Sequence, residues 1–322
     1  MNKLAHFCGA AALSFAVSFL LLGNALALDS VKIMIPANPG GGWDQTGRNL
    51  AKAMTEADVV KHVQFDNKGG AAGTIGLAQF VNTAKGDGSA ILVGGMVMVG
   101  GIILNKSQVN LSQVTPLARL TGEFEVLVAP VDSDIKTLAD LIAKLKANPG
   151  SVSWGGGSAG GTDHILAGMI AQAVGVDAAK VNYIAYAGGG EALAAILGGH
   201  VTVGISGYAE FAGQIKAGKF RALALSSDKR VPGIDVPTFK EQGVNVDLFN
   251  WRGIFAAPGI SDAQRNELLK SVDTTVKSKQ WQETLTRMDW ADLYLPGDGF
   301  KKYVDDENKR IGDILAKLNL KK

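Results

Sequence analysis

The stretch VKIMIPANPGGGWDQTGR at residues 31–48 places a strand, a glycine triplet and the start of a helix in immediate succession. Val31–Ile35 has the apolar character of a buried strand, and the apolar residues over Thr46–Ala57 have helical spacing. Asp44 suits the N-cap of that helix. Between the two, the glycines Gly40–Gly42 let backbone amides approach a ligand with no Cβ in the way. The free N–H groups and partial positive charge of a helix start therefore predict a site for a carboxylate or phosphate.

The same succession of strand, glycine triplet and helix occurs twice more, at Gly155–Gly157 and at Gly188–Gly190. One triplet alone can simply make a tight turn between a strand and a helix. Three of them on one chain favour a functional anion site, on condition that the fold brings the loops together.

The order of apolar segments predicts two α/β units in succession. In the first, strands at 31–35, 63–66 and 90–93 alternate with helices at 46–57 and 74–84, which indicates a parallel sheet covered by helices. A longer strand at 124–129 and a helix at 138–145 follow. The second unit has strands at 152–154, 181–186, 201–205 and 221–225, with helices at 162–174 and 191–197. Ligands of such sheets sit beyond the carboxyl ends of the strands, where all three triplets lie.

Two further helix starts carry a capping-box pattern, Thr137-x-x-Asp140 and Ser261-x-x-Gln264. The second opens one of two helices that we expect after a strand at 251–256. The last helix has an apolar stripe that begins at Phe300 and ends at Leu318. We interpret this stripe as a packing face, because the polar side of the helix mixes both charge signs.

The composition excludes several classes of protein. Of 322 residues, 32 are Lys or Arg and 30 are Asp or Glu, and no basic stripe marks a nucleic-acid partner. The one cysteine, Cys8, lies near the N-terminus, so the rest of the chain has no disulfide, thiol nucleophile or cysteine zinc site. No spacing of His, Asp and Glu is that of a transition-metal site. We therefore expect neither a metal nor a cofactor.

Residues 1–27 have the features of a signal peptide. Lys3 gives a positive start, Ala10–Leu22 an apolar core, and Ala25-Leu26-Ala27 a small-x-small cleavage site. We expect cleavage after Ala27 and export of roughly 295 residues, which is enough for two domains. The apolar core is short for a membrane span, and an uncleaved anchor is the alternative.

Two motifs around the second triplet suggest other functions. Gly155-x-Gly157-x-x-Gly160 matches the dinucleotide-binding fingerprint, but the next strand ends in Tyr186-Ala187-Gly188 where an acidic residue is expected. Gly156-x-Ser158-x-Gly160 matches the nucleophile elbow of hydrolases. His164 is too close along the helix start to act as its base, and His200 lies on the wrong side of the sheet. A secreted serine hydrolase using Ser158 is therefore an alternative, and we expect no catalytic residue.

Four side chains near the loops have two interpretations each. Trp43 is either a core residue or an aromatic wall of a ligand cleft. Arg48 and Lys68 follow anion-type loops, although exposed and solvated charge is the default for both. Arg252 lies in an apolar strand, which favours a buried and paired role.

Several motifs together resemble the solute receptors of tripartite tricarboxylate transporters, the TctC/Bug superfamily. The resemblance covers essentially the whole exported chain, and its motifs are Ile35–Arg48, Asn67–Gly76, Trp154–His164, Tyr186–Glu191 and Asn250–Gly253. Trp43, where most of the superfamily has Thr, resembles the tricarboxylate-type branch. Asp163 precedes His164 where many members have Pro.

The resemblance implies a type II periplasmic binding protein of the Venus-flytrap kind. Its fold would be α/β, with two lobes and a mostly parallel sheet flanked by helices in each. Lobe 1 would comprise residues 28–124 and 254–322, and lobe 2 residues 125–253, with hinge strands near 120–129 and 249–257. Family ligands are carboxylates, held largely by backbone amides and ordered water. A large and a small integral-membrane subunit receive them.

We therefore expect a periplasmic, monomeric receptor, and not an enzyme, that captures a citrate-like di- or tricarboxylate between its lobes. A carboxylate sensor for a signalling membrane protein is a second alternative. Because amides do not titrate, the affinity should vary little with pH above the ligand's own pKa values. The expected ligand-binding residues come from the loops and strand ends: Pro39, Gly40, Gly41, Gly42, Trp43, Asp44, Lys68, Gly94, Gly95, Gly157, Ser158, Ala159, Gly160, Gly161, Thr162, His164, Tyr186, Gly188, Gly189, Ser206, Tyr208 and Arg252.

Overall fold

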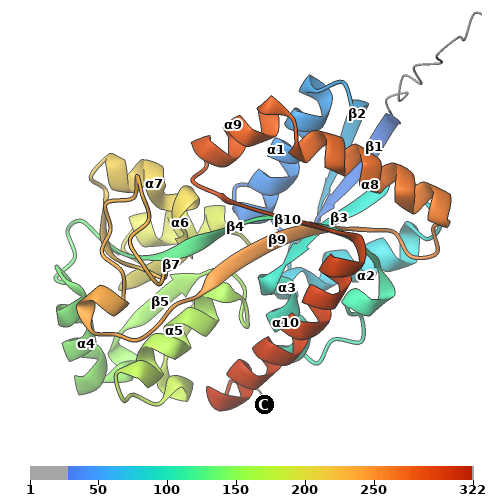
Figure 1. Cartoon of the computed structure of the whole chain (residues 1–322). Coiled ribbons are helices and arrows are strands. Elements are labelled where there is room, and N and C mark those ends of the chain that lie inside the picture. Colours follow the sequence, from blue (N-terminus) through green and yellow to red (C-terminus); the bar gives the residue numbers. More distant parts are fainter. Residues whose placement is uncertain (1–27, 321–322) are drawn as a thin grey trace, which may run out of the picture.

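The computed structural model describes residues 28–320, which form an α/β fold of two lobes (Figure 1). The predicted signal peptide, its cleavage site and Cys8 lie outside the described residues. Within residues 28–320, no helix is both long and apolar enough to cross a membrane.

Lobe 1 is built on three parallel strands in the order β2-β1-β3: β1 (Leu28–Ile35), β2 (Val60–Asn67) and β3 (Ala90–Gly95). Its helices from this part of the chain are α1 (Gly42–Glu56), α2 (Thr74–Thr83) and α3 (Met96–Leu104). The end of the chain returns as α8 (Asp262–Val276), α9 (Lys279–Arg287), β10 (Ala291–Pro296) and α10 (Gly297–Lys317). Helices α8 and α9 pack against α1, and α10 packs against α3, so both ends of the sequence build this lobe.

Lobe 2 repeats the arrangement with the strands β5 (Ser153–Gly156), β6 (Asn182–Ala185), β7 (Val203–Gly207) and β8 (Phe220–Leu225). Strand β5 lies between β6 and β7 and is parallel to both. The helices are α4 (Leu138–Ala147), α5 (Thr162–Ala173), α6 (Gly189–Leu197) and α7 (Tyr208–Lys216). Helices α5, α6 and α7 therefore each begin just after a strand of this lobe ends.

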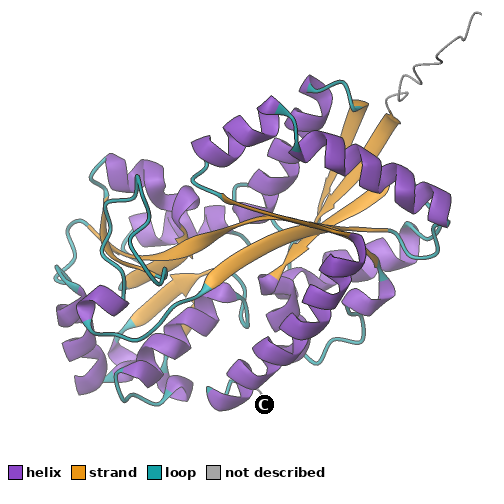
Figure 2. Ribbon diagram, in the orientation of Figure 1, coloured by secondary structure: helices purple, strands orange, loops and turns teal. Residues whose placement is uncertain are grey.

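Two long strands run through the middle of the molecule and join the lobes (Figure 2). Strand β4 (Thr115–Pro130) pairs with β9 (Phe249–Ala256) along its first part and with β7 and β8 along its second. Strand β9 also pairs with β3 of lobe 1. One sheet path, β2-β1-β3-β9-β4-β7-β5-β6, therefore continues through both lobes.

The core follows this sheet. Three tryptophans, Trp154, Trp251 and Trp281, are among the largest fully buried side chains. Trp251 lies edge-on to Phe300 of α10, which confirms that the apolar stripe of the last helix is a packing face. Both predicted capping boxes are also confirmed, at α4 and α8.

The fold differs from the expectation in three respects. The sheet is mixed, because β9 lies antiparallel between β3 and β4 and only the outer strands are parallel. Helix α1 begins at Gly42 with Gly41 as its N-cap, so Asp44 lies in the first turn and is not the N-cap. The sequence pattern does not predict α3, α7, α9 or β10. Helix α3 is apolar on all sides, and an apolar run without period does not distinguish a buried helix from a strand.

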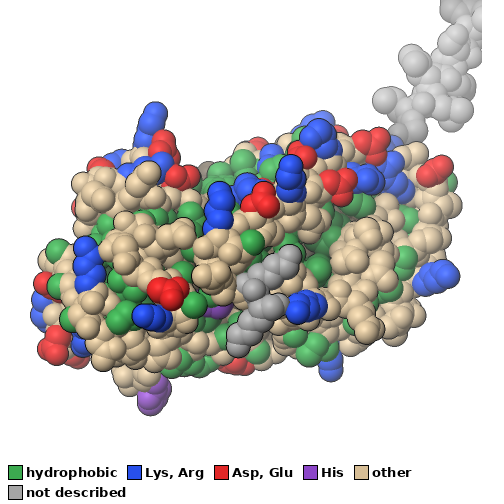
Figure 3. All heavy atoms as spheres, turned by 90° about the horizontal axis from the view of Figure 1, so that it is seen from below, with side chains coloured by type: hydrophobic (Ala, Val, Ile, Leu, Met, Phe, Trp, Pro, Cys, Tyr) green, Lys and Arg blue, Asp and Glu red, His purple; other side chains and the backbone are tan. Residues whose placement is uncertain are grey.

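On the face drawn in Figure 3, basic and acidic side chains are interspersed over the described residues. Pairs of opposite charge at i,i+4 spacing also occur on α8, α9 and α10. This distribution agrees with the sequence-based exclusion of a nucleic-acid partner.

Candidate functional site

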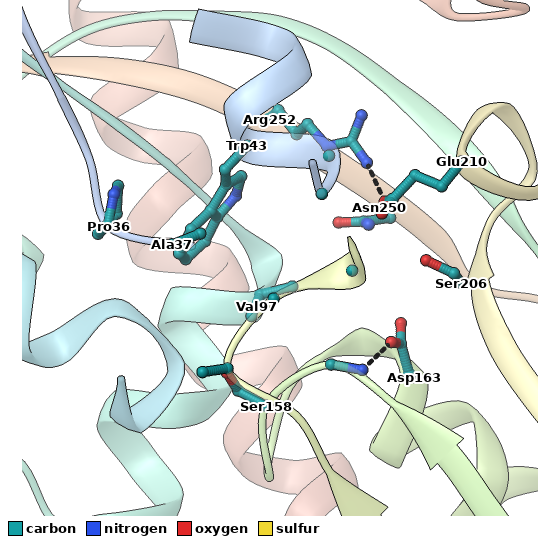
Figure 4. A pocket seen from close by; sticks show the side chains of 16 residues that line it. Pro36, Ala37, Trp43, Val97, Ser158, Asp163, Ser206, Glu210, Asn250 and Arg252 are labelled. Atoms are coloured by element: carbon teal, nitrogen blue, oxygen red, sulfur yellow. Dashed lines mark hydrogen bonds and ion pairs between the residues drawn. The ribbon is translucent and has the colours of Figure 1, made fainter. Parts of the chain in front are cut away.

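A cavity lies between the two lobes, where the sequence analysis expects the loops to converge (Figure 4). It comprises ≈ 540 Å³ of space not filled by protein atoms, part of which is open to solvent. Both lobes and the crossing strand β9 contribute to its wall. The lining residues are Pro36, Ala37, Gly41, Gly42, Trp43 and Val97 of lobe 1, Gly157, Ser158, Asp163, Ala187, Gly188, Gly189, Ser206 and Glu210 of lobe 2, and Asn250 and Arg252 of β9.

Five helices begin at this cavity. Helices α1, α3, α5, α6 and α7 each place a first-turn residue in its wall. The N-cap residue of each of these helices is a glycine, which has no side chain that could cap the helix. These N-cap residues are Gly41, Gly95, Gly161, Gly188 and Gly207.

The helices that begin elsewhere are of two kinds. Helices α4, α8 and α9 are capped by the side chains of Thr137, Ser261 and Ser278, whereas α2 and α10 have no side-chain cap. The first amides of a helix have no intrahelical acceptor, so an uncapped start leaves donors for a ligand. At α7 one of these amides already has a partner, because Ala209 N donates a hydrogen bond to Glu123 Oε2 (3.1 Å). The other first-turn amides at the cavity give its wall a set of main-chain donors with partial positive charge.

Arg252 is the cation of the site and is only 1 % exposed. Its Nη2 atom forms an ion pair with Glu123 and lies 3.5 Å from Glu210 Oε1. Its Nη1 atom is buried and has no hydrogen-bond partner among the described residues. On the same face of β9, the buried Oδ1 atom of Asn250 also lacks a partner within residues 28–320. Unpaired buried polar atoms are costly, so the Oδ1 atom of Asn250, whose side chain lines the cavity, is suited to bind a ligand that enters it.

Four carboxyl groups surround this arginine. Burial raises the pKa of Glu210 to about 8, although the Arg252 charge opposes the shift. Burial also raises the pKa of Asp163 to about 6, against a hydrogen bond donated by Gly157 N. Behind them, burial and the neighbouring carboxylates raise the pKa of Glu125 well above its usual value. The site therefore holds carboxyl groups that keep protons near neutral pH, which sequence analysis did not anticipate.

Nine of the predicted ligand-binding residues line the cavity: Gly41, Gly42, Trp43, Gly157, Ser158, Gly188, Gly189, Ser206 and Arg252. Trp43 is both an interior residue, 7 % exposed, and part of the cavity wall. Arg252 has the buried, paired role that its apolar strand predicts.

Other predicted residues lie behind the wall and position it. Asp44 accepts hydrogen bonds from Gly40 N, Arg48 Nε and Asn67 Nδ2, so it fixes the first glycine loop. Burial acts to raise the pKa of Asp44, but these bonds outweigh it and hold the pKa below its usual value. Gly94 and Gly95 pair with β9 next to Arg252 and allow the two backbones to approach closely.

His164 and its neighbours also lie outside the lining. Its Nδ1 atom accepts a hydrogen bond from Gly160 N (3.1 Å), and its ring stacks on Tyr183 at 4.4 Å. Burial lowers its pKa to about 4, so it is neutral near pH 7. Gly160 has a φ of +78°, which favours glycine in this turn. Three more predicted loop residues do not line the cavity within the described part of the chain: Ala159, Gly161 and Thr162.

The last four predictions fall further away. Lys68 is exposed on the loop after β2. Tyr208 is buried in the core of lobe 2, where Phe211 also packs. Tyr186 is partly buried after β6, and Pro39 lies on the exposed rim with Gly40. Within the described residues, none of these belongs to the cavity wall.

Sequence reasoning missed seven lining residues: Pro36, Ala37, Val97, Asp163, Ala187, Glu210 and Asn250. Two signals were available for some of them. Asn250 is two positions before Arg252, and residues i and i+2 of a strand share a face. Asp163 and Glu210 are acidic residues in the first turn of a helix that follows a strand end. Their carboxylates did not fit an anion site, so the pattern gave no reason to include them.

The lobes touch across the cavity. Asn38 Nδ2 donates to Glu191 Oε1 of lobe 2 at 2.5 Å. A Cβ on Gly41 would lie 2.7 Å from Gly189 N, and one on Gly100 would strike the carbonyl oxygen of Gly160. The structure therefore shows a closed arrangement, with glycine at the points of closest approach.

The hydrolase alternative finds no support in this geometry. Ser158 lines the cavity, but no hydrogen bond joins it to a histidine within the described part of the chain. The nearest histidine in sequence, His164, directs Nδ1 to Gly160 N. A serine nucleophile needs a base within hydrogen-bond reach.

Comparison with known proteins places this geometry in a family. A family model described as "Tripartite tricarboxylate transporter family receptor" matches residues 46–320. The chain belongs to this receptor family. Its members and structural neighbours are solute-binding receptors and not enzymes, so the expected family and the expected absence of catalysis are confirmed.

Three solved structures share the fold of this receptor. The periplasmic binding protein BugD is 24% identical, with a TM-score of 0.82, and the match covers 91% of this chain and 98% of BugD. MatC from Rhodopseudomonas palustris, with bound malate, is 22% identical with a TM-score of 0.79 (89% and 99% covered). Rpa4515 from R. palustris, with adipate, is 22% identical with a TM-score of 0.82 (90% and 97% covered). The two-lobed fold predicted for this receptor is thereby confirmed.

Proposed function

We propose that this receptor captures a small di- or tricarboxylate, of the citrate type, in the cavity between its lobes. The observation that carries the proposal is the convergence of five helix starts with glycine N-caps on one cavity that the buried cation Arg252 also lines. Two proteins of the same fold support the class of ligand, because their structures contain malate and adipate.

The energies are sufficient for useful affinity. One helix start stabilises an anion by ~0.3–1 kcal/mol when exposed and by up to ~2 kcal/mol in a partly buried site. A micromolar Kd requires ~8 kcal/mol. Several starts, together with hydrogen bonds from Arg252 to a carboxylate, can supply this amount in a cavity from which closure excludes water.

Binding would be coupled to closure of the lobes. We propose lobe 1 as residues 28–124 and 254–322 and lobe 2 as residues 125–253, with the hinge in β4 near 120–129 and in β9 near 249–257. Only these two strands pass directly from one lobe to the other within the described sheet. A small rotation about them would separate Gly41 from Gly189 and open the cavity.

The transport role follows from the family. We propose that the closed, loaded receptor, acting as a monomer, docks on a large and a small integral-membrane subunit and releases the carboxylate to them. We also propose that the chain is exported to the periplasm after cleavage behind Ala27. N-terminal sequencing of the exported protein should then begin at Leu28.

A thermal-shift screen followed by calorimetry tests the ligand class. Citrate, malate and adipate serve as probes, and the neutral diamides of malate and adipate serve as matched controls. A ligand at 100 times its Kd stabilises the folded state by ~2.7 kcal/mol, which raises the melting temperature measurably. If diamides stabilise the receptor as well as the acids do, or if no carboxylate binds, the proposed function is wrong.

A further inference from the structure

The wall of the cavity contains a carboxyl group at the place where a ligand carboxylate is expected. Glu210, from the first turn of α7, extends to the starts of α1 and α6 (Figure 4). Its Oε1 atom would lie 2.8 Å from a Cβ on Gly42, and its Oε2 atom would contact a Cβ on Gly189. The side chain therefore borders helix starts of both lobes.

An unpartnered atom marks the same space as a ligand site. Asn250 lines the cavity, and its Oδ1 atom is buried and has no partner among residues 28–320. Arg252 also lines the cavity, and its Nη2 atom lies 3.5 Å from Glu210 Oε1. A ligand carboxylate that approaches Arg252 in this cavity therefore comes close to Glu210.

The charges that face Glu210 come from three elements. Strand β4 contributes Glu123 and Glu125, α5 contributes Asp163, and β9 contributes Arg252. Acidic residues at the starts of α1 and α6 have other partners, since Asp44 binds Arg48 and Glu191 binds Asn38.

The cluster therefore has four carboxyl groups and one guanidinium. If all were ionised, the buried group would carry three excess negative charges, which burial strongly disfavours. A dianionic ligand would add to this excess. Burial already raises the pKa of Glu210 to about 8, and a ligand carboxylate beside it can only raise it further.

We propose that Glu210 binds the ligand in its protonated form and donates its O–H hydrogen bond to a ligand carboxylate, so that carboxylate capture takes up a proton from solvent at this side chain. This rests on the proposed function, because it requires an anionic ligand. It replaces the sequence-based expectation that affinity varies little with pH, since that expectation included only amide donors. It also assigns selectivity, because a ligand with an ammonium group would instead favour ionised Glu210 and release the proton.

Calorimetry measures the proton directly. With Glu210 titrating near pH 8 in the free receptor and protonated in the complex, affinity should fall about tenfold between pH 7 and pH 9. Titrations at pH 9 in two buffers of different ionisation enthalpy should show uptake of about 0.9 proton per ligand. The probes are malate, adipate and citrate, whichever the thermal-shift screen shows to bind.

The variant Glu210→Gln separates this role from a structural one. Glutamine keeps a hydrogen-bond donor and cannot ionise, so the affinity of the variant should be the same at pH 7 and at pH 9, whereas that of the wild type falls about tenfold. The matched control is Glu283→Gln on the exposed surface of α9, which should keep the full pH dependence.

The outcomes distinguish the two proposals. If no carboxylate binds at any pH, both fail. If a carboxylate binds the wild type with no proton uptake at pH 9, the role of Glu210 is wrong and the carboxylate function stands. Proton uptake that persists in Glu210→Gln would likewise overturn the assignment. Should that variant not fold, the proton count of the wild type still decides.

Discussion

Replacement of Gly41 by valine tests whether closure of the two lobes supplies part of the affinity. Gly41 has φ −91° and ψ 179°, an extended conformation that any residue adopts. A Cβ there would lie 2.7 Å from Gly189 N and 3.2 Å from Gly189 Cα, and the next nearest atom is Glu210 Oε2 at 3.5 Å. All three atoms belong to lobe 2. The substitution therefore leaves lobe 1 free to fold but keeps the lobes apart.

The expected loss of binding affinity follows from the ligand contacts that an incompletely closed cavity cannot make. A ligand in a cavity held open at Gly189 loses at least its contact with the start of α6, which is worth ~1–2 kcal/mol in a partly buried site. This corresponds to about a 5- to 30-fold weaker Kd. The melting temperature of the ligand-free variant should stay near that of the wild type, since the new side chain meets no atom of its own lobe among the three nearest.

Calorimetry with a carboxylate that binds the wild type gives the affinity, and small-angle X-ray scattering gives the closure. The loaded variant should remain more extended than the loaded wild type. Gly100→Ala, which meets the carbonyl of Gly160 in lobe 2, should show the same pattern. Gly213→Val is the matched control, because nothing lies within 4 Å of its Cβ position. Wild-type affinity in a folded Gly41→Val protein would refute the closed-cavity reasoning.

Three further changes have defined outcomes. Arg252→Gln leaves Glu123 buried without its ion-pair partner and should lower the free energy of unfolding in urea by about 3–5 kcal/mol; a loss under about 1 kcal/mol would contradict a buried pair. Trp251→Phe removes the 2.8 Å bond from Nε1 to Glu307 Oε2 between β9 and α10, and should cost about 1–3 kcal/mol in the same assay. Burial lowers the pKa of His164 from 6.5 to about 4, so the unfolded chain binds a proton that the folded protein does not, and stability falls as pH drops from 6.5 to 4. This loss is up to about 3 kcal/mol, and His164→Gln should show a smaller drop in melting temperature between pH 7 and pH 4.5; an equal drop would assign the acid sensitivity to other groups.

Much of the fold could be predicted because its signals are local. The strand at β1, the glycine loop and α1 follow one another within 31–56, and each is specified by neighbouring residues. The capping boxes at Thr137 and Ser261 are likewise contained in four residues. Helix α3 was missed because Met96–Leu104 is apolar on every side and has no period to interpret.

The candidate site could be predicted only in part. Gly41, Gly157 and Gly188 line the cavity as their loop positions suggest. Asp44 and Tyr208 come from equally suggestive positions, but one side chain turns back to Arg48 and the other enters the core of lobe 2. The direction in which a side chain points depends on what packs beside it, and a loop pattern does not contain that information.

The sequence by itself determined most of the elements, the three glycine loops and the family to which the receptor belongs. Only the tertiary structure decided that five helix starts meet at one cavity, and that Glu210 and Asp163 stand there beside Arg252. The reason is physical: glycine, capping and apolar spacing act within a few residues along the chain. The meeting of α1 with α6, and the pKa values of buried carboxyl groups, depend on long-range pairing of β4 with β9 and on charges brought together by it.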